Sequence, residues 1–338
     1  MWAVSHRQRC LWLWGQIMIV TVWGFLILGL VILLLAGDAL VKGAVNLSLR
    51  LGVPALIVSL TIVAFGTSAP ELLISISAIL DNAPGIAMGN VVGSNTANIL
   101  LVLGIPALLA TMHTSEFETR KTYNFMIAAS ILFIALAFRG VFDWKAGLVL
   151  LAALAFVLAD SFRDAKAHRN ACKNAMNGDA VPEEADPDMP GWKIGLFLVL
   201  GMIGLPLGAE LLVDNATHVA RDWGVSDTVI GLTVVAIGTS LPELATTVMA
   251  ALRRQADVAL GNVIGSNMFN LLAIIGIASF VGPIPVDPGF LWFDLWVMLG
   301  ASLLLIPFVF LGRDITRAWG ISLSALYALY LVVVLIWA

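Results

Sequence analysis

The chain has 338 residues, of which 60% are hydrophobic and only 12% are charged, and its mean hydropathy is +0.98. A typical soluble domain carries about twice that share of charged residues, so the composition excludes an ordinary water-soluble globular protein. The net charge of −4, without a clustered basic face, argues against a nucleic-acid partner.

The amino-terminal segment, residues 1–16, is expected to be a loosely ordered extension. A secretory signal is the alternative, but the apolar run from Leu11 to Gly37 is too long for a signal core. Cys10 and Cys172 lie far apart in polar segments without C-x-x-C spacing. They therefore indicate neither a disulfide framework nor a thiolate metal site.

Apolar runs long enough to cross a bilayer, about 17 to 25 residues each, recur along almost the whole chain. We predict an all-α membrane protein with ten transmembrane helices. Five spans lie in 17–160, a polar linker rich in turn formers covers 161–191, and five more lie in 192–338. The spans are centred on residues 20–46, 54–80, 84–111, 123–139, 144–160, 192–217, 226–252, 256–281, 290–311 and 318–337.

The two halves of the chain resemble each other. Gly37–Gly104 superimposes without a gap on Ala209–Gly276, and more than a third of the aligned residues are identical. Because each half has an odd number of predicted spans, the second half enters the membrane from the opposite side. The sequence therefore predicts two inverted five-helix repeats, an architecture that places a binding site near the bilayer midplane.

Most of the 18 Lys and Arg residues fall in loops on one side of the predicted bundle. The positive-inside rule makes this side cytoplasmic, with both termini outside and the central linker in the cytoplasm. Arg7 and Arg9 are an exception to this pattern. Several tryptophans near span ends, such as Trp144, Trp192 and Trp223, are typical of an interfacial belt.

Glu71 and Glu243 occupy equivalent positions in the middle of apolar spans. A carboxylate at this depth costs roughly 2.5 to 3.5 kcal/mol and usually marks an ion or proton path. Each glutamate follows a Gly-Thr-Ser-x-Pro sequence, and its proline removes a backbone hydrogen bond and opens the helix. Freed carbonyls, hydroxyls and carboxylates form an all-oxygen site, which favours hard cations such as Ca²⁺ and Na⁺.

A second repeated cluster reads Gly-Asn-x-x-Gly-Ser-Asn-x-x-Asn. Ser94 and Asn98 share one helix face, as do Ser266 and Asn270. The glycines also suit close helix packing, and we expect both roles. Asp38 and Glu210, another equivalent pair, are either gating or interfacial residues, and Lys42 offers Asp38 a partner four residues away. The acidic linker, Glu183–Asp188, lacks the EF-hand pattern and is expected to be a solvated spacer.

The paired GTS-x-PE and GN-x-x-GSN-x-x-N segments resemble the two alpha-repeats of the calcium:cation antiporter superfamily, and most closely the prokaryotic sodium/calcium exchanger proteins. The resemblance covers the ten-span body and implies secondary active exchange of Ca²⁺ for Na⁺, with no cofactor and no enzymatic activity. It also implies a monomer in a bacterial or archaeal cytoplasmic (inner) membrane. Exchange of Ca²⁺ for H⁺ is the alternative.

By this resemblance, the carboxylates of Glu71 and Glu243 and the carbonyls of Thr67 and Thr239 hold calcium. Two sodium sites flank it, and each shares one glutamate with the calcium site. The resemblance assigns Ala64, Thr67, Ser68, Ser94 and Glu243 to one sodium site, and Ala236, Thr239, Ser240, Ser266 and Glu71 to the other.

Asn98 and Asn270 fall where the family places central polar residues. The family carries an aspartate at the position of Asn270, so this chain departs from the pattern there. The central cluster is left with two ionisable groups, which weakens any inference about sodium stoichiometry or a coupled proton.

Overall fold

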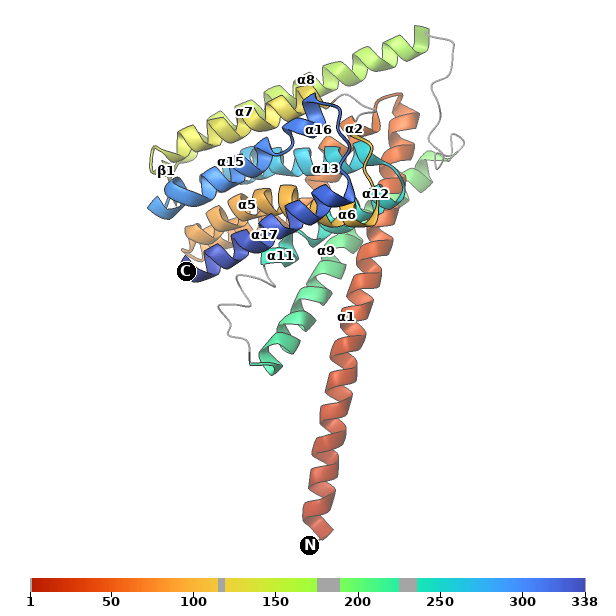
Figure 1. Ribbon diagram of the computed structural model, residues 1–338, viewed down its shortest axis with the longest axis vertical. Helices are drawn as coiled ribbons and strands as arrows, with labels where there is room; N and C mark the ends of the chain where they lie inside the picture. The colour runs from red at the N-terminus through yellow and green to blue at the C-terminus, as the bar shows by residue number, and fades with distance from the viewer. Residues whose placement is uncertain (1, 115–118, 175–188, 225–235, 338) are drawn as a thin grey trace.

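The fold is described from a computed structural model that covers backbone residues 2–114, 119–174, 189–224 and 236–337, and side chains within 21–114, 119–168, 189–224 and 237–336. The predicted acidic spacer and the start of the seventh predicted span lie outside these described residues, as do the side chains of both cysteines. Figure 1 shows a bundle of helices from which α1 (Trp2–Leu51) projects.

The first half of the chain is almost entirely helical, because apolar runs are interrupted only by short Gly, Pro and Asn turns. Its elements after α1 are α2 (Ala55–Val58), η1 (Ser59–Val63), α3 (Ala64–Thr67), α4 (Ala69–Leu80), α5 (Pro84–Ala97), η2 (Asn98–Val102), α6 (Gly104–Leu109), α7 (Arg120–Ala137), β1 (Val141–Phe142) and α8 (Trp144–Asn174).

The second half is likewise helical where it is described. Its elements are α9 (Gly191–Asp222), α11 (Ala236–Thr239), α12 (Leu241–Leu252), α13 (Ala256–Met268), η5 (Phe269–Ile274), α14 (Ile275–Val281), β2 (Ile284–Pro285), η6 (Phe290–Asp294), α15 (Leu295–Leu303), α16 (Ile306–Phe310) and α17 (Arg317–Trp337). The strands β1 and β2 pair antiparallel and connect the two halves at one end of the bundle.

Seven described helices are long and apolar enough to cross a membrane, and the bent pair formed by Ala55–Thr67 and Ala69–Leu80 raises the number to eight. The two remaining predicted spans correspond to α7, with 18 residues, and α12, with 12 residues. The protein is therefore an all-α membrane protein. The exposed Trp144, Trp192 and Trp223 lie at helix ends, as expected for an interfacial belt.

Two boundary expectations differ from the structure. Residues 2–16 continue α1 as helix, because no proline interrupts the chain before Leu51. Helix α8 continues beyond residue 160 to Asn174, well into the predicted linker. Its polar extension is anchored at its start, where Lys121 forms ion pairs with Asp160 (2.6 Å) and Asp164 (2.7 Å). In both places a helix continues into a segment that the sequence pattern assigned to irregular structure.

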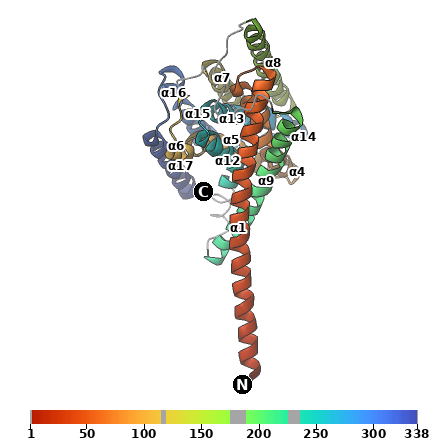
Figure 2. The same ribbon diagram turned by 90° about the vertical axis from the view of Figure 1, so that its right-hand side faces the viewer.

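Helices α1 and α9 lie side by side over a long contact (Figures 1 and 2). Small residues make this approach possible. A Cβ atom built on Gly29 would lie 2.9 Å from the carbonyl oxygen of Gly208, and one built on Gly201 would lie 2.6 Å from Cβ of Leu40. Interfaces of this kind are typical of membrane helices, where close backbone packing replaces the hydrophobic effect.

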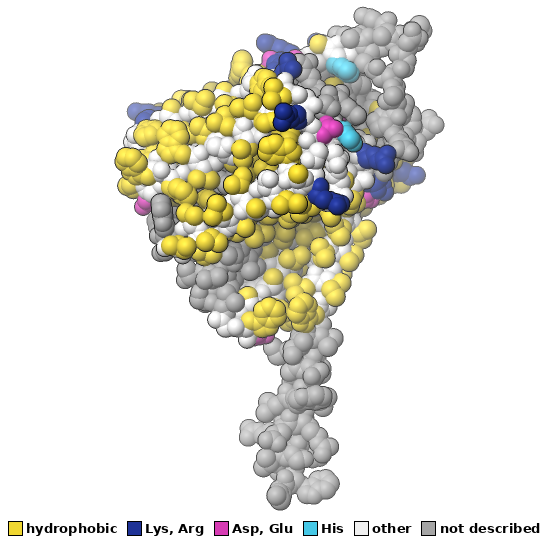
Figure 3. Space-filling view, in the orientation of Figure 1, with side chains coloured by type: hydrophobic (Ala, Val, Ile, Leu, Met, Phe, Trp, Pro, Cys, Tyr) yellow, Lys and Arg dark blue, Asp and Glu magenta, His cyan; other side chains and the backbone are white. Residues whose placement is uncertain are grey.

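The two helical stretches that carry the Gly-Asn motifs form the centre of the bundle. In the most apolar windows of 256–281 and 84–109, 89% and 78% of the residues are buried, against 17% for 317–336. The outer helices instead expose large apolar side chains (Figure 3), as a lipid-facing surface requires. Lys, Arg and His side chains gather mainly toward the upper right margin of the face in Figure 3. The motif helices are thus the scaffold on which the candidate site is built.

Candidate functional site

Two equivalent helix breaks form the centre of the site. Ser68 (φ −87°, ψ 4°) separates α3 from α4, and Ser240 (φ −88°, ψ 4°) separates α11 from α12. Pro70 and Pro242 stand at the second position of the new helices, where the missing N–H costs no hydrogen bond. The predicted opening of both helices is confirmed, and the first pair bends by 41°.

Each break places a glutamate in the first turn of a new helix, Glu71 in α4 and Glu243 in α12. The positive end of the helix dipole favours an anion there. The side chains are 1% and 0% exposed. Within the described part of the chain, Oε2 of each glutamate has no hydrogen-bond partner. Two buried carboxylate oxygens with unused acceptor capacity are suited to a cation.

Hydroxyl groups from both halves gather at the carboxylate of Glu243. The Ser68 hydroxyl donates to Oε1 of Glu243 (3.3 Å), and the hydroxyls of Thr67 and Ser266 also lie close to that carboxylate. Thr67 Oγ1 lies 3.3 Å from Ser266 Oγ and 3.3 Å from the Ala64 carbonyl oxygen. The serine that joins this group is therefore Ser266, whereas the family resemblance placed Ser94 there.

The counterpart group belongs to the second half. Helix α11, which ends at Thr239, packs against α5, the helix that carries Ser94, just as α3 packs against α13, which carries Ser266. Ser94 and Ser240 are 4% and 1% exposed, and Thr239 is half-buried. Ala236 begins α11, and its side chain is outside the described set. Ser94 therefore lies on the helix that packs against α11, as Ser266 lies on the helix that packs against α3.

Asn98 and Asn270 both lie where the motif helices widen into π-helices, η2 and η5. Such insertions recur at functional sites because they rotate side chains and loosen the backbone ladder. Both asparagines are buried, at 1% and 0% exposure. The Asn98 amide donates to Asn267 Oδ1 (3.1 Å), while neither polar atom of Asn270 has a partner among the residues described. The sequence pattern gave no sign of either π-helix.

Two further asparagines, to which the sequence pattern assigns no separate role, hydrogen-bond to the backbone of the glutamates. Asn90 Nδ2 donates to the backbone carbonyl of Glu71 and to Ser75 Oγ, each at 3.1 Å. Asn262 reaches the carbonyl of Glu243 (3.5 Å) in the same way. Their appearance at the same place in both repeated motifs was the available signal. These amides hold the backbone of each glutamate against one of the central motif helices.

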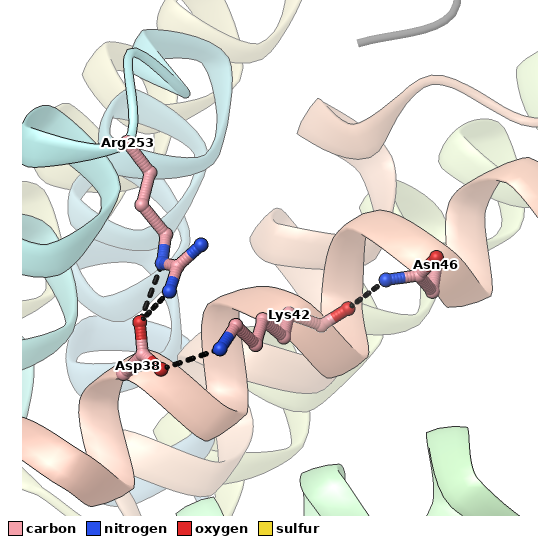
Figure 4. Close-up of polar contacts among 4 residues, drawn as sticks. All are labelled: Asp38, Lys42, Asn46 and Arg253. Carbon is pink, nitrogen blue, oxygen red and sulfur yellow. Dashed lines mark hydrogen bonds and ion pairs between the residues drawn. The ribbon is translucent and has the colours of Figure 1, made fainter. Parts of the chain in front are cut away.

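Asp38 contacts the site helix α12 from outside (Figure 4). It accepts hydrogen bonds from the Arg253 guanidinium at the end of α12 and forms an ion pair with Lys42 (3.0 Å). The Lys42 carbonyl in turn accepts from Asn46 (2.9 Å). The i,i+4 partner of Asp38 was predicted, whereas Arg253, 215 residues away, was not. Asp38 thus holds α1 on the helix that carries Glu243, whereas its equivalent Glu210 is exposed.

The site contains oxygen and amide groups only. Among the residues described, no three His, Cys, Asp or Glu side chains form a metal-binding cluster. Carboxylates, hydroxyls and carbonyls on broken transmembrane helices match the chemistry of hard cations. The fold and the site define a membrane transporter for small cations, built around two helix breaks.

Comparison with known proteins identifies the family. The sodium/calcium exchanger protein family matches residues 21–162 and 193–336, and the chain belongs to it. The protein is therefore an antiporter-type transporter and not an enzyme.

Three relatives illustrate its place in the family. The sodium/calcium exchanger MaX1 of Methanosarcina acetivorans is 36% identical over 91% of this chain and 97% of its own. The solved structure of the sodium–calcium exchanger NCX_Mj superimposes with a TM-score of 0.77 at 32% identity, covering 92% of this chain and 97% of the other. A more distant relative, the Ca²⁺/H⁺ antiporter ChaA of Bacillus subtilis, is 26% identical over 78% of each chain.

Proposed function

We propose that this protein exchanges Ca²⁺ for Na⁺ by alternating access around the site formed by Glu71 and Glu243. The observation that carries the proposal is the pair of buried carboxylates whose Oε2 atoms lack protein partners within the described residues. Leaving such atoms unsatisfied costs about 1–3 kcal/mol each, and more when they are charged. A cation bound between them removes this cost, and two carboxylates match the charge of Ca²⁺.

Sodium would bind in two flanking groups, each of which includes one of the same glutamates. Following the contacts above, the first comprises the Ala64 carbonyl, Thr67, Ser68, Ser266 and Glu243. The second comprises the Ala236 carbonyl, Thr239, Ser240, Ser94 and Glu71. Because the glutamates are common to all sites, calcium and a full sodium load exclude each other. This exclusion makes the exchange obligatory.

The proposed topology has ten spans in two inverted repeats, 17–160 and 192–338, joined by a linker at 161–191. Both termini face outward, and the linker is cytoplasmic. Introducing one cysteine at a time into each loop of a Cys10→Ser/Cys172→Ser protein, and labelling it in intact cells with a membrane-impermeant reagent, tests this arrangement. Labelling of a cysteine in the linker, with none at the carboxyl terminus, would reverse the proposed orientation.

The function is tested by uptake of radioactive calcium into everted membrane vesicles. A sodium gradient directed outward from the vesicle lumen should drive calcium accumulation, and an ionophore that collapses the sodium gradient should abolish it. If a sodium gradient does not move calcium, the proposal fails.

Exchange against protons is the second candidate, favoured by the relationship to the Ca²⁺/H⁺ antiporter ChaA. In that case Glu71 and Glu243 would carry protons instead of sharing sodium. Calcium uptake driven by a pH gradient in sodium-free buffer would support this candidate, and uptake that requires sodium would eliminate it.

The role of the carboxylates is tested with Glu71→Gln and Glu243→Gln, which keep side-chain size and remove the charge. Both variants should lose exchange while retaining a folded protein. Asp81→Asn is the matched control, because Asp81 is an exposed carboxylate at the other end of α4. Exchange retained by both glutamine variants would remove the two glutamates from the mechanism.

A further inference from the structure

Two asparagines that are not among the candidate ligands join the motif helices at the centre of the bundle. Asn95 in α5 donates from Nδ2 to the carbonyl oxygen of Asn267 in α13 (3.2 Å), and Asn267 donates back to the carbonyl oxygen of Asn95 (3.4 Å). Both side chains are 1% exposed. We call this reciprocal pair, Asn95 with Asn267, the amide clasp.

Methionine sulfur atoms lie behind the clasp on both sides. Asn95 Nδ2 lies 3.8 Å from the sulfur of Met298, and Asn267 Nδ2 lies 3.8 Å from that of Met126. The two methionines occupy equivalent positions in the halves and are fully buried. A thioether is a weak acceptor, so each sulfur contacts the Nδ2 group of its asparagine without displacing the stronger bond to the backbone carbonyl. The amide groups are therefore held with their Oδ1 atoms free to act elsewhere.

Of the two asparagines of the clasp, only Asn267 forms a described hydrogen bond with a candidate ligand of the cation site. Asn267 Oδ1 accepts from Asn98 Nδ2 (3.1 Å), which leaves Asn98 Oδ1 without a partner among the described residues. An amide whose nitrogen is fixed presents its oxygen in a fixed direction. Asn267 therefore orients a candidate ligand without being one.

The equivalent bond of the other half is not formed. It would run from Asn270 Nδ2 to Asn95 Oδ1, and within the described residues both atoms are buried without a partner. Asn270 Oδ1 is likewise unpaired, and the side chain is 0% exposed. The two halves have asparagine at all four equivalent positions. The same side chains could therefore form an alternative state, in which Asn270 donates to Asn95 and Asn98 no longer donates to Asn267.

We propose that Asn95 and Asn267 are positioning residues that determine which of Asn98 and Asn270 presents its amide oxygen to the transported cation. The bond passes from Asn98–Asn267 to Asn270–Asn95 when the site turns to the opposite face of the membrane. The inference rests on the proposed exchange function and on the inverted arrangement of the halves. It assigns the clasp a role in affinity at each face, beyond holding α5 and α13 together.

The test measures the KM for calcium separately at the two faces, in everted and right-side-out vesicles. Asn267→Ala, which removes the acceptor of Asn98, should raise KM about five- to tenfold at one face, as expected for loss of one buried hydrogen bond. Asn95→Ala should raise it similarly at the opposite face. Ser130→Ala is the control, because among the described residues this buried hydroxyl of α7 bonds to the carbonyl of Met126 on its own helix and to no other helix.

A double variant separates positioning from packing. If Asn267 acts through Asn98, the Asn98→Ala/Asn267→Ala protein should have the same KM as Asn98→Ala alone. Equal KM changes at both faces, or a lower maximal rate with unchanged KM, would show that the clasp only packs the helices and would overturn the proposal. If an alanine variant does not yield a monodisperse protein, the corresponding Asn→Ser variant is judged by the same criteria.

The same vesicles distinguish this proposal from the proposed function. If the unmodified protein shows no gradient-driven calcium uptake, the exchange function itself is wrong. Normal uptake by the unmodified protein with face-independent effects in the asparagine variants refutes the positioning role alone.

Discussion

The contact between α1 and α9 depends on glycine at position 29. A Cβ atom there would lie 2.9 Å from both the Gly208 carbonyl oxygen and the Leu212 amide nitrogen, whereas ordinary van der Waals contact begins at 3.4 Å. Both obstacles are backbone atoms, so no side-chain rotation relieves the clash. The helices must separate by about half an ångström, and overpacking of this kind costs about 1–3 kcal/mol.

Gly29→Ala is therefore expected to destabilise the folded protein by about 1–3 kcal/mol. Gly24, on the same helix, is the matched control, because it is exposed and a Cβ there meets no described atom within 4 Å. Gly24→Ala should leave stability unchanged or raise it by up to about 1 kcal/mol, because alanine favours helix.

The measurement is reversible unfolding by SDS titration in mixed micelles, performed on both variants and the unmodified protein. Equal stabilities of the two alanine variants would show that the close backbone approach at Gly29 does not limit the packing of α1 on α9. A Gly29→Ala protein more stable than the unmodified chain would refute the prediction equally.

Two further predictions concern charges. Asp38→Asn and Arg253→Gln should each destabilise the protein. In a double-mutant cycle their coupling energy should be about 1 kcal/mol or more, since both side chains are less than one-fifth exposed. Strictly additive effects would show that the pair contributes nothing. The Ala146 N–H, which donates to Asp143 Oδ1 (2.9 Å) at the start of α8, lowers the pKa of Asp143. The ionised Asp143 carboxylate therefore stabilises the folded protein fully above the pKa of about 3.9 that it has in the unfolded chain. This stabilisation is lost as the pH falls through the lower pKa of the folded state. The free energy of unfolding, measured between pH 6 and pH 3, should show this loss in the unmodified protein. The loss should be smaller in Asp143→Asn, whose neutral amide also caps the helix. Identical pH profiles of the two proteins would contradict this role of Asp143.

The sequence alone predicted the features that depend on local pattern. The breaks at Ser68 and Ser240 follow from proline two residues later, and apolar composition is sufficient to identify a membrane protein. The burial of Glu71 and Glu243 follows from their place in apolar runs. Each of these inferences requires only residues within one helix.

The sequence could not show which half supplies the neighbours of each residue. Ser266 rather than Ser94 meets Thr67, because α3 packs against the motif helix of the other half. Arg253 reaches Asp38 for the same reason, across 215 residues. Helix periodicity determines the face on which a side chain lies, but the partner of that face is determined by tertiary packing.

The crossed pattern of contacts has a consequence for how the gene can be divided. The hydroxyls of Thr67 and Ser68 serve the carboxylate of Glu243, so neither half contains a complete set of donors on its own. Two separately translated halves should regain activity only when they assemble in one membrane, as in fragment complementation. A gene that encoded only one half would supply a complete set of donors only if two copies of its product assembled.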